Sequence, residues 1–346
     1  MNQTQGFPEM PWNRVLRFTD PLPCQAAVQG SDVEILPTKS GDFQLEITQI
    51  GMDRLWMQRF HVSLPQVSTV ASKPGRRWIG FLTESNSSPL QHCGLEVLPG
   101  DIIVNRLDVA HQRSGADYHY GAMSLPIDEL DIAVEAIIGR EFMKGLDQRI
   151  IRLHPALISR LLKLHKAVGQ LAHDTPDILE LPEVLRALEE QLIHVMVRCL
   201  AEGAAVETST GGRRHDEIVA RFEGFLEANH DRPLYLPEIC AAIGVAERTL
   251  RASCEQHLGM GPIRYLTLRR MHLVRRALLR TDPSKATVTR IVTDHGFWEL
   301  GRFSVAYRTL FGESPSESLR RPFEQPEITL NRPSSLPATE LTARVN

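Results

Sequence analysis

The sequence has few cysteines and no arrangement of them that would hold a fold together. There are five among 346 residues, and no two are separated by only two residues. They are Cys24, Cys93, Cys199, Cys240 and Cys254. Disulfide-rich secreted domains use an even set, and zinc ribbons use CxxC pairs. The odd count therefore argues against both and predicts a protein of a reducing, cytoplasmic compartment.

The sequence also lacks long apolar runs and the motifs of common enzyme sites. No apolar stretch approaches the roughly 20 residues that span a membrane, and residues 1–6 do not begin a secretion signal. No His-x-His pair followed by a nearby glutamate is present. The spacings do not repeat among His61, His92, His111 and His119. We therefore predict no membrane association, no catalytic or metal-ligating residue and no cofactor.

Two features of the first half suggest further sites. His92 and Cys93 resemble a nucleophile pair, but adjacent residues on a strand point to opposite faces and would not meet. Four large aromatic residues fit either a buried core, which is the simpler interpretation, or the lining of a pocket for a small effector. They are Trp56, Phe60, Trp78 and Phe81.

The two halves of the sequence differ in charge. Residues 232–321 contain 15 lysines and arginines against 8 aspartates and glutamates, a net charge of +7. The whole chain carries −3, so the remainder carries −10. A basic C-terminal region beside an acidic one is typical of a polyanion-binding domain attached to a domain of another kind.

The first half predicts a small antiparallel β-roll or barrel followed by helices. Residues 1–30 contain several prolines and are expected to be an irregular lead-in. Over 33–124, short apolar or alternating runs such as 43–50 are separated by turns that contain glycine or proline. Helical spacing of leucine and isoleucine then predicts helices at 127–145, 154–172 and 182–200.

These patterns divide the chain into domains. We expect a sensing or dimerisation domain over 31–202, in which the leucine-rich helices of 126–202 pack on the barrel, form a dimer face, or do both. Residues 203–213 are small, polar and glycine-rich, which is typical of a linker. A helical domain follows over 214–323, and the Pro/Ser-rich tail, 324–346, is expected to be disordered.

The strongest motif lies over residues 288–315. A short helix is predicted before Gly296, which makes a turn, and a second helix runs from about Glu299 to Phe311. This is a helix-turn-helix, whose second helix enters the DNA major groove. Phe297 and Trp298 are expected to fill its core. We expect the second helix to turn Phe303, Tyr307, Leu310 and Phe311 inward and to leave Leu300, Arg302, Val305 and Arg308 for DNA.

A looser copy of this pattern lies upstream, over 236–259, with Gly244 at the turn. Its second helix, 246–257, is expected to bury Leu250 and Cys254 and to expose Arg248, Arg251, Ala252 and Glu255. An arginine-rich helix over 262–280 joins the two copies. At 1.5 Å per residue it spans roughly 28 Å, close to the about 34 Å between successive major grooves on one face of DNA.

Residues 218–321 thereby resemble the DNA-binding domain of the AraC/XylS family of bacterial transcription regulators. The resemblance rests on the arginine-rich helix, on the Gly259-x-Gly-Pro262 step, and on Gly244, Leu250, Gly296, Phe297, Phe303, Phe311 and Pro315. The stretch 296–303 is similar to the subgroup that contains the ethanolamine-utilisation regulator. Two residues depart from the family: Ala246 stands where a capping Ser or Thr is frequent, and Cys254 stands where a bulky aromatic is usual.

The resemblance implies an α+β protein, with a cupin-like β-roll that matches the family in arrangement only and an all-α domain of two helix-turn-helix units. It implies that bases are faced by Arg248, Arg251, Ala252, Leu300, Gly301, Arg302 and Val305, with Thr249 beside them. Arg269 and Arg308 are the expected phosphate contacts, which position the protein without specifying sequence.

The main hypothesis is a sequence-specific transcription regulator, by family habit an activator, in a bacterial cytoplasm and associated with the nucleoid. Its expected partners are double-stranded promoter DNA, RNA polymerase, a second copy of the chain and an unidentified small effector. Two alternatives stay open. The N-terminal domain only dimerises, or it is a cupin-like enzyme fused to a DNA-binding domain.

Overall fold

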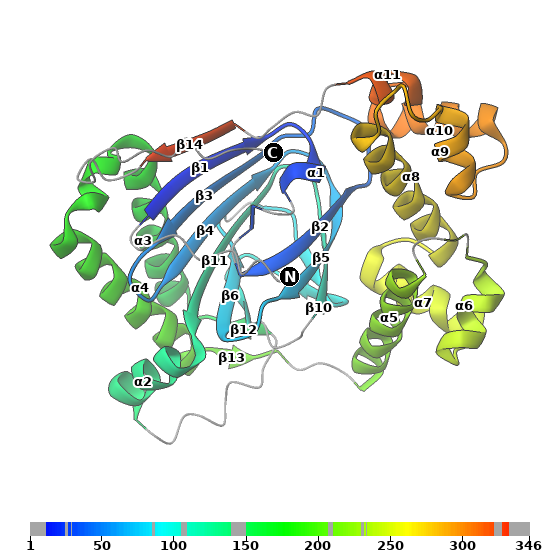
Figure 1. Ribbon diagram of the computed structural model, residues 1–346. Helices are drawn as coiled ribbons and strands as arrows, with labels where there is room; N and C mark the ends of the chain where they lie inside the picture. The colour runs from blue at the N-terminus through cyan, green and yellow to red at the C-terminus, as the bar shows by residue number, and fades with distance from the viewer. Residues whose placement is uncertain are drawn as a thin grey trace.

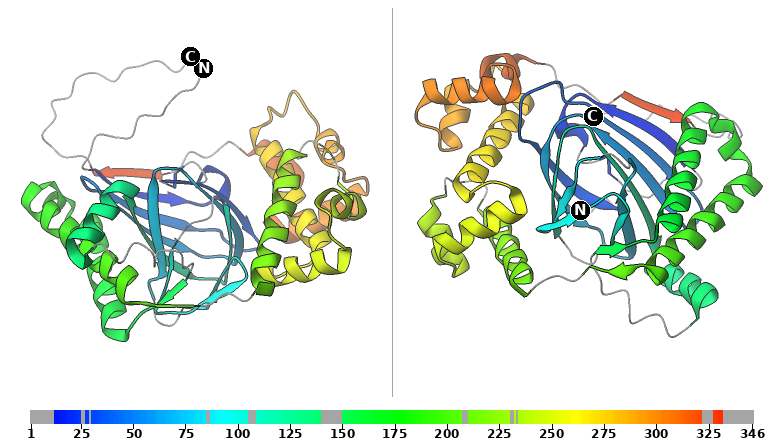
Figure 2. Two further views of the ribbon diagram at one scale, coloured as in Figure 1. Left: turned by 90° about the horizontal axis from the view of Figure 1, so that it is seen from below. Right: turned by 180° about the vertical axis from the view of Figure 1, so that it is seen from behind.

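A computed structural model describes a sheet-rich N-terminal region and a helical C-terminal region (Figure 1). The described residues are 12–24, 27–28, 30–84, 87–104, 109–139, 150–206, 210–229, 232, 234–321 and 327–331. Helices α2–α4 lie on one side of the sheets and the C-terminal helices on the other (Figure 2). These first helices are α2 (Ile127–Ile138), α3 (Pro155–Asp174) and α4 (Pro182–Glu202).

Two antiparallel sheets make up the N-terminal region. The larger has nine strands in the order β13 (Ala204–Ala205), β12 (Ile150–Arg152), β9 (Asp101–Val104), β6 (Arg76–Leu82), β11 (Tyr118–Pro126), β4 (Trp56–Val62), β3 (Leu45–Gly51), β1 (Trp12–Phe18) and β14 (Glu327–Asn331). The smaller has five, in the order β2 (Ser31–Pro37), β5 (Gln66–Ser72), β10 (Val109–Ser114), β7 (Leu90–His92) and β8 (Leu95–Val97).

The larger sheet has a core on each face, because successive side chains of a strand point to opposite sides. Met57 on β4 and Met123 on β11 belong to the cluster formed with α2, α3 and α4. Val62 and Tyr118, from the same two strands, belong to the cluster shared with the five-stranded sheet. The space between the two sheets is therefore lined from both sides.

Seven helices form the described C-terminal region. They are α5 (Thr210–Ala228), α6 (Leu236–Ile243), α7 (Glu247–Leu258), α8 (Pro262–Arg280), α9 (Val288–Asp294), α10 (Leu300–Phe311) and α11 (Pro315–Arg320). The long helix α8 serves two cores. Tyr265 packs with α5–α7, whereas Val274 and Leu278 pack with α9 and α10. None of the described helices is long and apolar enough to cross a membrane.

The predicted helices agree closely with the structure, and the ends of the chain differ from it. The helix predicted at 127–145 ends at Ile138, and residues 140–149 lie outside the described residues. Strand β1 and helix α1 (Pro21–Cys24) lie within the predicted irregular lead-in, and β14 lies within the predicted disordered tail. Helix α5 begins inside the predicted linker. Strands β1 and β14 could not be recognised from the local sequence, because β1 pairs with β3 and with β14, both distant in sequence.

Candidate nucleic-acid interface

In the first helix pair, a glycine turn sets the direction of α7. Gly244 has a φ of 67°, the left-handed conformation that glycine adopts without steric cost. Val245 then donates its backbone N–H to the carbonyl oxygen of Cys240 at 3.0 Å, which closes the end of α6. On α7, Leu250 and Cys254 are both fully buried, as predicted. The turn and these two anchors fix which face of α7 is outward.

The outward face of α7 carries the side chains predicted to meet DNA. Arg248, Arg251 and Ala252 are exposed, and Thr249 is half-buried. The guanidinium of Arg251 donates to Glu247 one turn earlier, at 2.9 Å. Ala246, the residue just before the helix, provides no side-chain cap. This agrees with the prediction made from alanine standing where a capping Ser or Thr is frequent.

In the second helix pair, α9 and α10 repeat this construction. The hydroxyl of Thr287 accepts the backbone N–H of Arg290 at 3.3 Å and so caps the start of α9. Gly296 has a φ of 78°. Phe297 then donates its N–H to the carbonyl of Val292 at 3.2 Å. A helix, a left-handed glycine and a partly buried aromatic therefore follow one another, as the prediction of a turn at Gly296 requires.

An aromatic chain fixes α10 from inside. Phe297 and Phe303 lie 4.8 Å apart between ring centroids, and Tyr307 and Phe311 lie 4.5 Å apart. Tyr307 is fully buried, and its hydroxyl lies 2.8 Å from that of Ser318 on α11. Helix α11 opens at the buried Pro315 with a reciprocal cap between Ser314 and Glu317. The opposite side of α10 is thereby left to solvent.

The exposed side of α10 combines apolar and cationic groups. Leu300, Gly301, Arg302, Val305 and Arg308 are all exposed, as predicted. Val305 is 70% exposed, which is unusual for a valine and consistent with an apolar contact made only in a complex.

The prediction that Trp298 fills the core was wrong, because its side chain is 72% exposed. Phe297 occupies the core position against Phe303, and the following residue points outward. Trp298 therefore joins the exposed apolar groups at the start of α10.

Arg269, predicted as a phosphate contact, is not on an exposed surface. Its side chain is 8% exposed and lies 2.5 Å from a carboxylate oxygen of Glu227 on α5. Glu34 on β2 approaches the same guanidinium at 3.9 Å. A phosphate contact by Arg269 would require it to exchange these carboxylates for DNA.

Two more arginines of α8 bind the N-terminal region. Arg275 forms an ion pair with Asp20 and lies 3.2 Å from Glu313, and Arg276 lies 3.0 Å from Glu34. The charge asymmetry of the sequence is thus partly neutralised inside the molecule. Charge counting missed this because Asp20 and Glu34 lie 255 and 242 residues away from the arginines that they bind.

Apolar contacts accompany these ion pairs. Leu36 of β2 and Val67 of β5 belong to the same buried cluster as Phe222 and Leu250. The ring of His272 lies 3.1 Å from the carbonyl oxygen of Pro37, and burial lowers the pKa of this histidine to about 4. The helical region therefore packs on the five-stranded sheet through apolar contacts as well as ion pairs.

A small cavity of about 90 Å³, partly open to solvent, lies between the two sheets. Its walls include Trp56, Phe60 and Trp78, three of the four aromatics predicted for core or pocket. The fourth, Phe81, is fully buried on the other face of the sheet. Three of the four aromatic residues therefore line the cavity, and the fourth belongs to the buried core.

Polar side chains from both sheets also line this cavity, among them Gln58, Gln112 and Arg76. Arg76 lies with its guanidinium 3.8 Å from the ring centroid of Trp56 and donates to the carbonyl oxygens of Arg54 and Ser124. Burial lowers the pKa of Arg76 to about 10, so the group is charged near neutral pH. Burial also raises the pKa of the Tyr118 hydroxyl well above its usual range. The cavity thus offers aromatic walls and a cation to a small occupant.

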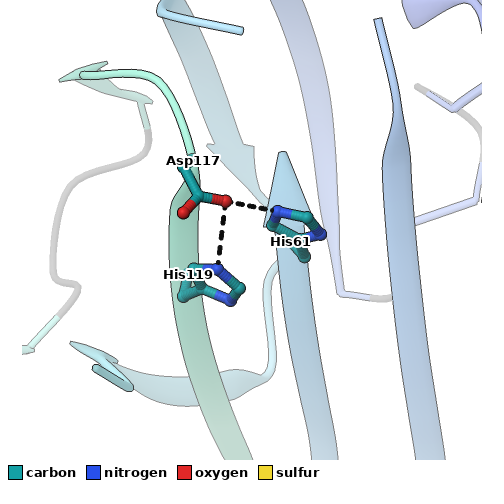
Figure 3. Close-up of side chains that lie close together, drawn as sticks. All are labelled: His61, Asp117 and His119. Carbon is teal, nitrogen blue, oxygen red and sulfur yellow. Dashed lines mark hydrogen bonds and ion pairs between the residues drawn. The ribbon is translucent and has the colours of Figure 1, made fainter. Parts of the chain in front are cut away.

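The four histidines singled out in the sequence form two different sets. His92 and His111 are buried, and burial lowers the pKa of His111 to about 4. His61 and His119 instead lie next to each other near the surface, with Asp117 between their ring nitrogens (Figure 3).

Comparison with known proteins supports the prediction of a helix-turn-helix domain in the C-terminal region. A family profile described as "Helix-turn-helix domain" matches residues 239–321, which span α6 to α11. This segment of the chain therefore matches a helix-turn-helix domain. The matched segment begins in α6 and ends after α11, so it spans both helix pairs and the connecting helix α8.

Two curated relatives are named as regulators. The probable thc operon regulatory protein of Rhodococcus erythropolis is 36% identical over 178 residues, 48% of this chain and 53% of the relative. The XylDLEGF operon transcriptional activator 2 of Pseudomonas putida is 34% identical over 95 residues, 28% of this chain and 60% of the relative. The matched segments thus span little more than half the length of these curated relatives.

Among solved structures, the AraC-like transcriptional activator CuxR aligns over 74% of this chain and 89% of its own, with 16% identity and a TM-score of 0.40. A score this low supports no conclusion about the N-terminal fold.

Proposed function

We propose that this protein is a sequence-specific transcription regulator that binds promoter DNA through α7 and α10. One observation carries the proposal. Two helix pairs share a turn glycine, a buried inner face and an exposed outer face with arginines, and a single helix, α8, joins their cores. Such a pair is the unit that places its second helix in a major groove.

The separation of the two pairs fits two successive grooves. Helix α8 has 19 residues and so extends over about 28 Å, near the about 34 Å of one turn of DNA. In this proposal Arg248, Arg251 and Arg302 read base edges, and Arg308 contacts a phosphate. Val305, which cannot donate a hydrogen bond, would contact a thymine methyl group.

The N-terminal region would control this binding. We assign it the role of a cupin-like sensing roll, because a cavity with aromatic walls and a cation lies between its sheets. The region would also form a homodimer, with the helices α3 and α4 as its face. Activation through RNA polymerase is suggested by the relatives, since one of them is named as a transcriptional activator. The likeness of residues 296–303 to the ethanolamine-regulator subgroup, and association with the nucleoid, stay predictions.

The first test is recovery of the DNA bound by the full chain in its own host. We expect a small number of sites that share a motif of two half-sites about one helical turn apart. Recovery that is diffuse and independent of sequence would contradict the proposal and indicate a non-specific DNA-binding protein.

The sensing role is tested by thermal denaturation against a panel of small metabolites. A compound that binds the cavity should raise the melting temperature, because it binds the folded state alone. Ala122 lines the cavity, so Ala122→Phe should fill the cavity and abolish the shift. If no compound raises the melting temperature, or if the shift persists in Ala122→Phe, the cavity is not the sensing site.

A further inference from the structure

His61, Asp117 and His119 form a compact cluster on the nine-stranded sheet (Figure 3). His61 lies on β4 and His119 on β11, and these two residues are direct partners across the antiparallel pair. Asp117 lies immediately before β11. One ligand atom from each of the three residues lies within 4.8 Å of the other two. The cluster could not be predicted from sequence spacing, because strand pairing brings together residues that are 58 positions apart.

Both imidazoles approach the same carboxylate oxygen. The Nε2 atom of His61 lies 2.8 Å from Oδ1 of Asp117, and Nε2 of His119 lies 3.3 Å from it. The two rings are stacked, with centroids 4.3 Å apart and planes 10° apart. Two nitrogens and one oxygen therefore converge on one small volume.

The backbone fixes the carboxylate in this place. Asp117 has a φ of 53°, a left-handed conformation that aspartate adopts more readily than most other residues. Its N–H donates to the carbonyl oxygen of Ser63 at 3.1 Å, which ties the turn to the end of β4. The aspartate is thus held at the turn by a tertiary contact as well as by its own strand.

We propose that His61, Asp117 and His119 bind a divalent first-row transition metal, of which Zn²⁺ is the representative tested below. Imidazole nitrogen and carboxylate oxygen are ligands that such ions prefer, at about 2.0–2.2 Å. Ligands at that distance in a tetrahedron lie roughly 3.3 Å from each other, which is close to the 2.8 and 3.3 Å between each imidazole nitrogen and the carboxylate oxygen. Three protein ligands leave the fourth position of the tetrahedron to water.

Small side-chain rotations would complete the site. Parallel rings do not aim their lone pairs at a single point, so each ring must turn about its Cβ–Cγ bond, which is a broad torsion for histidine. The side chains of His61 and Asp117 are 41% and 78% exposed and have room to do so. The exposure also predicts moderate rather than very tight affinity, because water competes for the same positions.

The neighbouring carboxylate does not complete the ligand set. Glu46 on β3 is the cross-strand partner of His61 on its other side. It is bound to Arg17, whose Nε donates to Glu46 at 2.8 Å. The proposed site therefore consists of two histidines and one aspartate.

The site lies directly behind the wall of the cavity. Residues that alternate with the ligands on the same strands, Phe60 and Val62 on β4 and Tyr118 and Tyr120 on β11, line the cavity between the sheets. A metal ion on the outer face would cross-link β4 to β11 where these four side chains are attached. Metal binding and occupation of the cavity would then act on the same pair of strands.

Isothermal titration of tag-free full-length protein with Zn²⁺ tests the proposal. We expect one ion per chain in addition to any weaker binding, and at least a tenfold loss of affinity in His119→Gln and in His61→Gln. Glutamine keeps a hydrogen-bonding side chain of similar reach, so the strands should still pair. His173→Gln is the matched control, because His173 lies 3.0 Å from Asp174 at the surface and belongs to no three-ligand group among the described residues.

Co²⁺ provides an independent measurement on the unaltered chain. A tetrahedral nitrogen–oxygen site gives visible absorption bands that saturate at one equivalent and disappear on addition of Zn²⁺. No saturable Zn²⁺ binding, or binding that is equal in the wild type, His61→Gln and His119→Gln, would overturn the proposal. The cluster would then be a hydrogen-bonded pair of histidines on an aspartate. Neither result depends on whether the protein binds promoter DNA.

Discussion

At the scale of single residues, the exposed side chains of α7 and α10 are available to DNA at little cost. Arg251 forms an ion pair with Glu247 of the same helix, at 2.9 Å. Arg302 forms one with Glu299, the residue just before α10, at 2.7 Å. Exposed pairs of this kind contribute little to stability. DNA can therefore replace the glutamate as partner, and the arginine can donate two hydrogen bonds to guanine.

We expect Arg251→Ala to weaken binding at a cognate site by about 1–3 kcal/mol and to weaken binding to random DNA less, because a base contact carries specificity. Fluorescence anisotropy on both DNAs measures the two losses. Arg17→Ala is the control, because Arg17 forms an exposed pair with Glu46 at 2.8 Å, but on the nine-stranded sheet. Equal losses on the two DNAs would identify Arg251 as a phosphate contact.

Glu223 predicts a pH dependence of stability. Burial raises its pKa to about 7, although Tyr265 and Arg269 act in the opposite direction. The folded protein thus keeps a proton that the unfolded chain, with the usual pKa of 4.5, releases. Stability contributed by the protonated group is present below pH 4.5 and is lost as the pH rises through 7.

Glu223→Gln should therefore match the wild type near pH 4.5 and exceed it by about 1–3 kcal/mol at pH 8. Urea denaturation at both pH values measures the difference. Glu217→Gln, an exposed position on the same helix, should change neither. A variant that is destabilised equally at both pH values would show that the carboxylate is not the titrating group.

At the scale of secondary-structure elements, the turn glycines determine the orientation of α7 and α10, the two helices proposed to enter the major groove. Gly244 has a positive φ, whereas Gly224 lies in the middle of α5 with open space where a Cβ would be. We expect Gly244→Ala to cost about 1–2 kcal/mol and Gly224→Ala to add about 0.5–1 kcal/mol. Thermal denaturation compares the two. An equal effect of both substitutions would mean that the turn conformation is not under strain.

The elements that could be predicted from sequence are those with local signals. Helix α8 was predicted at its observed bounds, since Pro262 opens it and the apolar spacing continues to Arg280. The inner and outer faces of α7 and α10 followed from the same periodicity. Strands β1 and β14 could not be predicted, because their stability comes from partners that are distant in sequence.

The candidate site was predictable to a similar extent. The exposure of Arg248, Arg251, Arg302 and Arg308 follows from helix period alone. The burial of Arg269 does not, because its carboxylate partners belong to α5 and β2. Trp298 shows the limit of assigning adjacent aromatics to one core, since two neighbouring residues cannot both point inward at the end of a turn.

At the scale of the whole molecule, the two regions are joined by ion pairs that are mostly removed from water. Asp20 is the buried partner of Arg275. Removing one charge of such a pair leaves the other without compensation.

We expect Asp20→Asn to destabilise the protein by about 1–3 kcal/mol and to increase hydrogen exchange of α8 and β2. Thermal denaturation and exchange mass spectrometry measure the two effects. Asp32→Asn is the control, because Asp32 lies on β2 and is largely exposed beside Lys73. Unchanged exchange in Asp20→Asn would show that the interface does not depend on this pair.

The order of the nine-stranded sheet has a mechanical consequence for the DNA-binding region. The chain leaves this sheet at one edge strand, β13, runs through α5 to α11, and rejoins it at the opposite edge strand, β14, where five residue pairs join it to β1. The helical region is therefore connected to the nine-stranded sheet by a strand at each of its two ends. A single cut between β13 and α5 would therefore leave it attached to the sheet through β14.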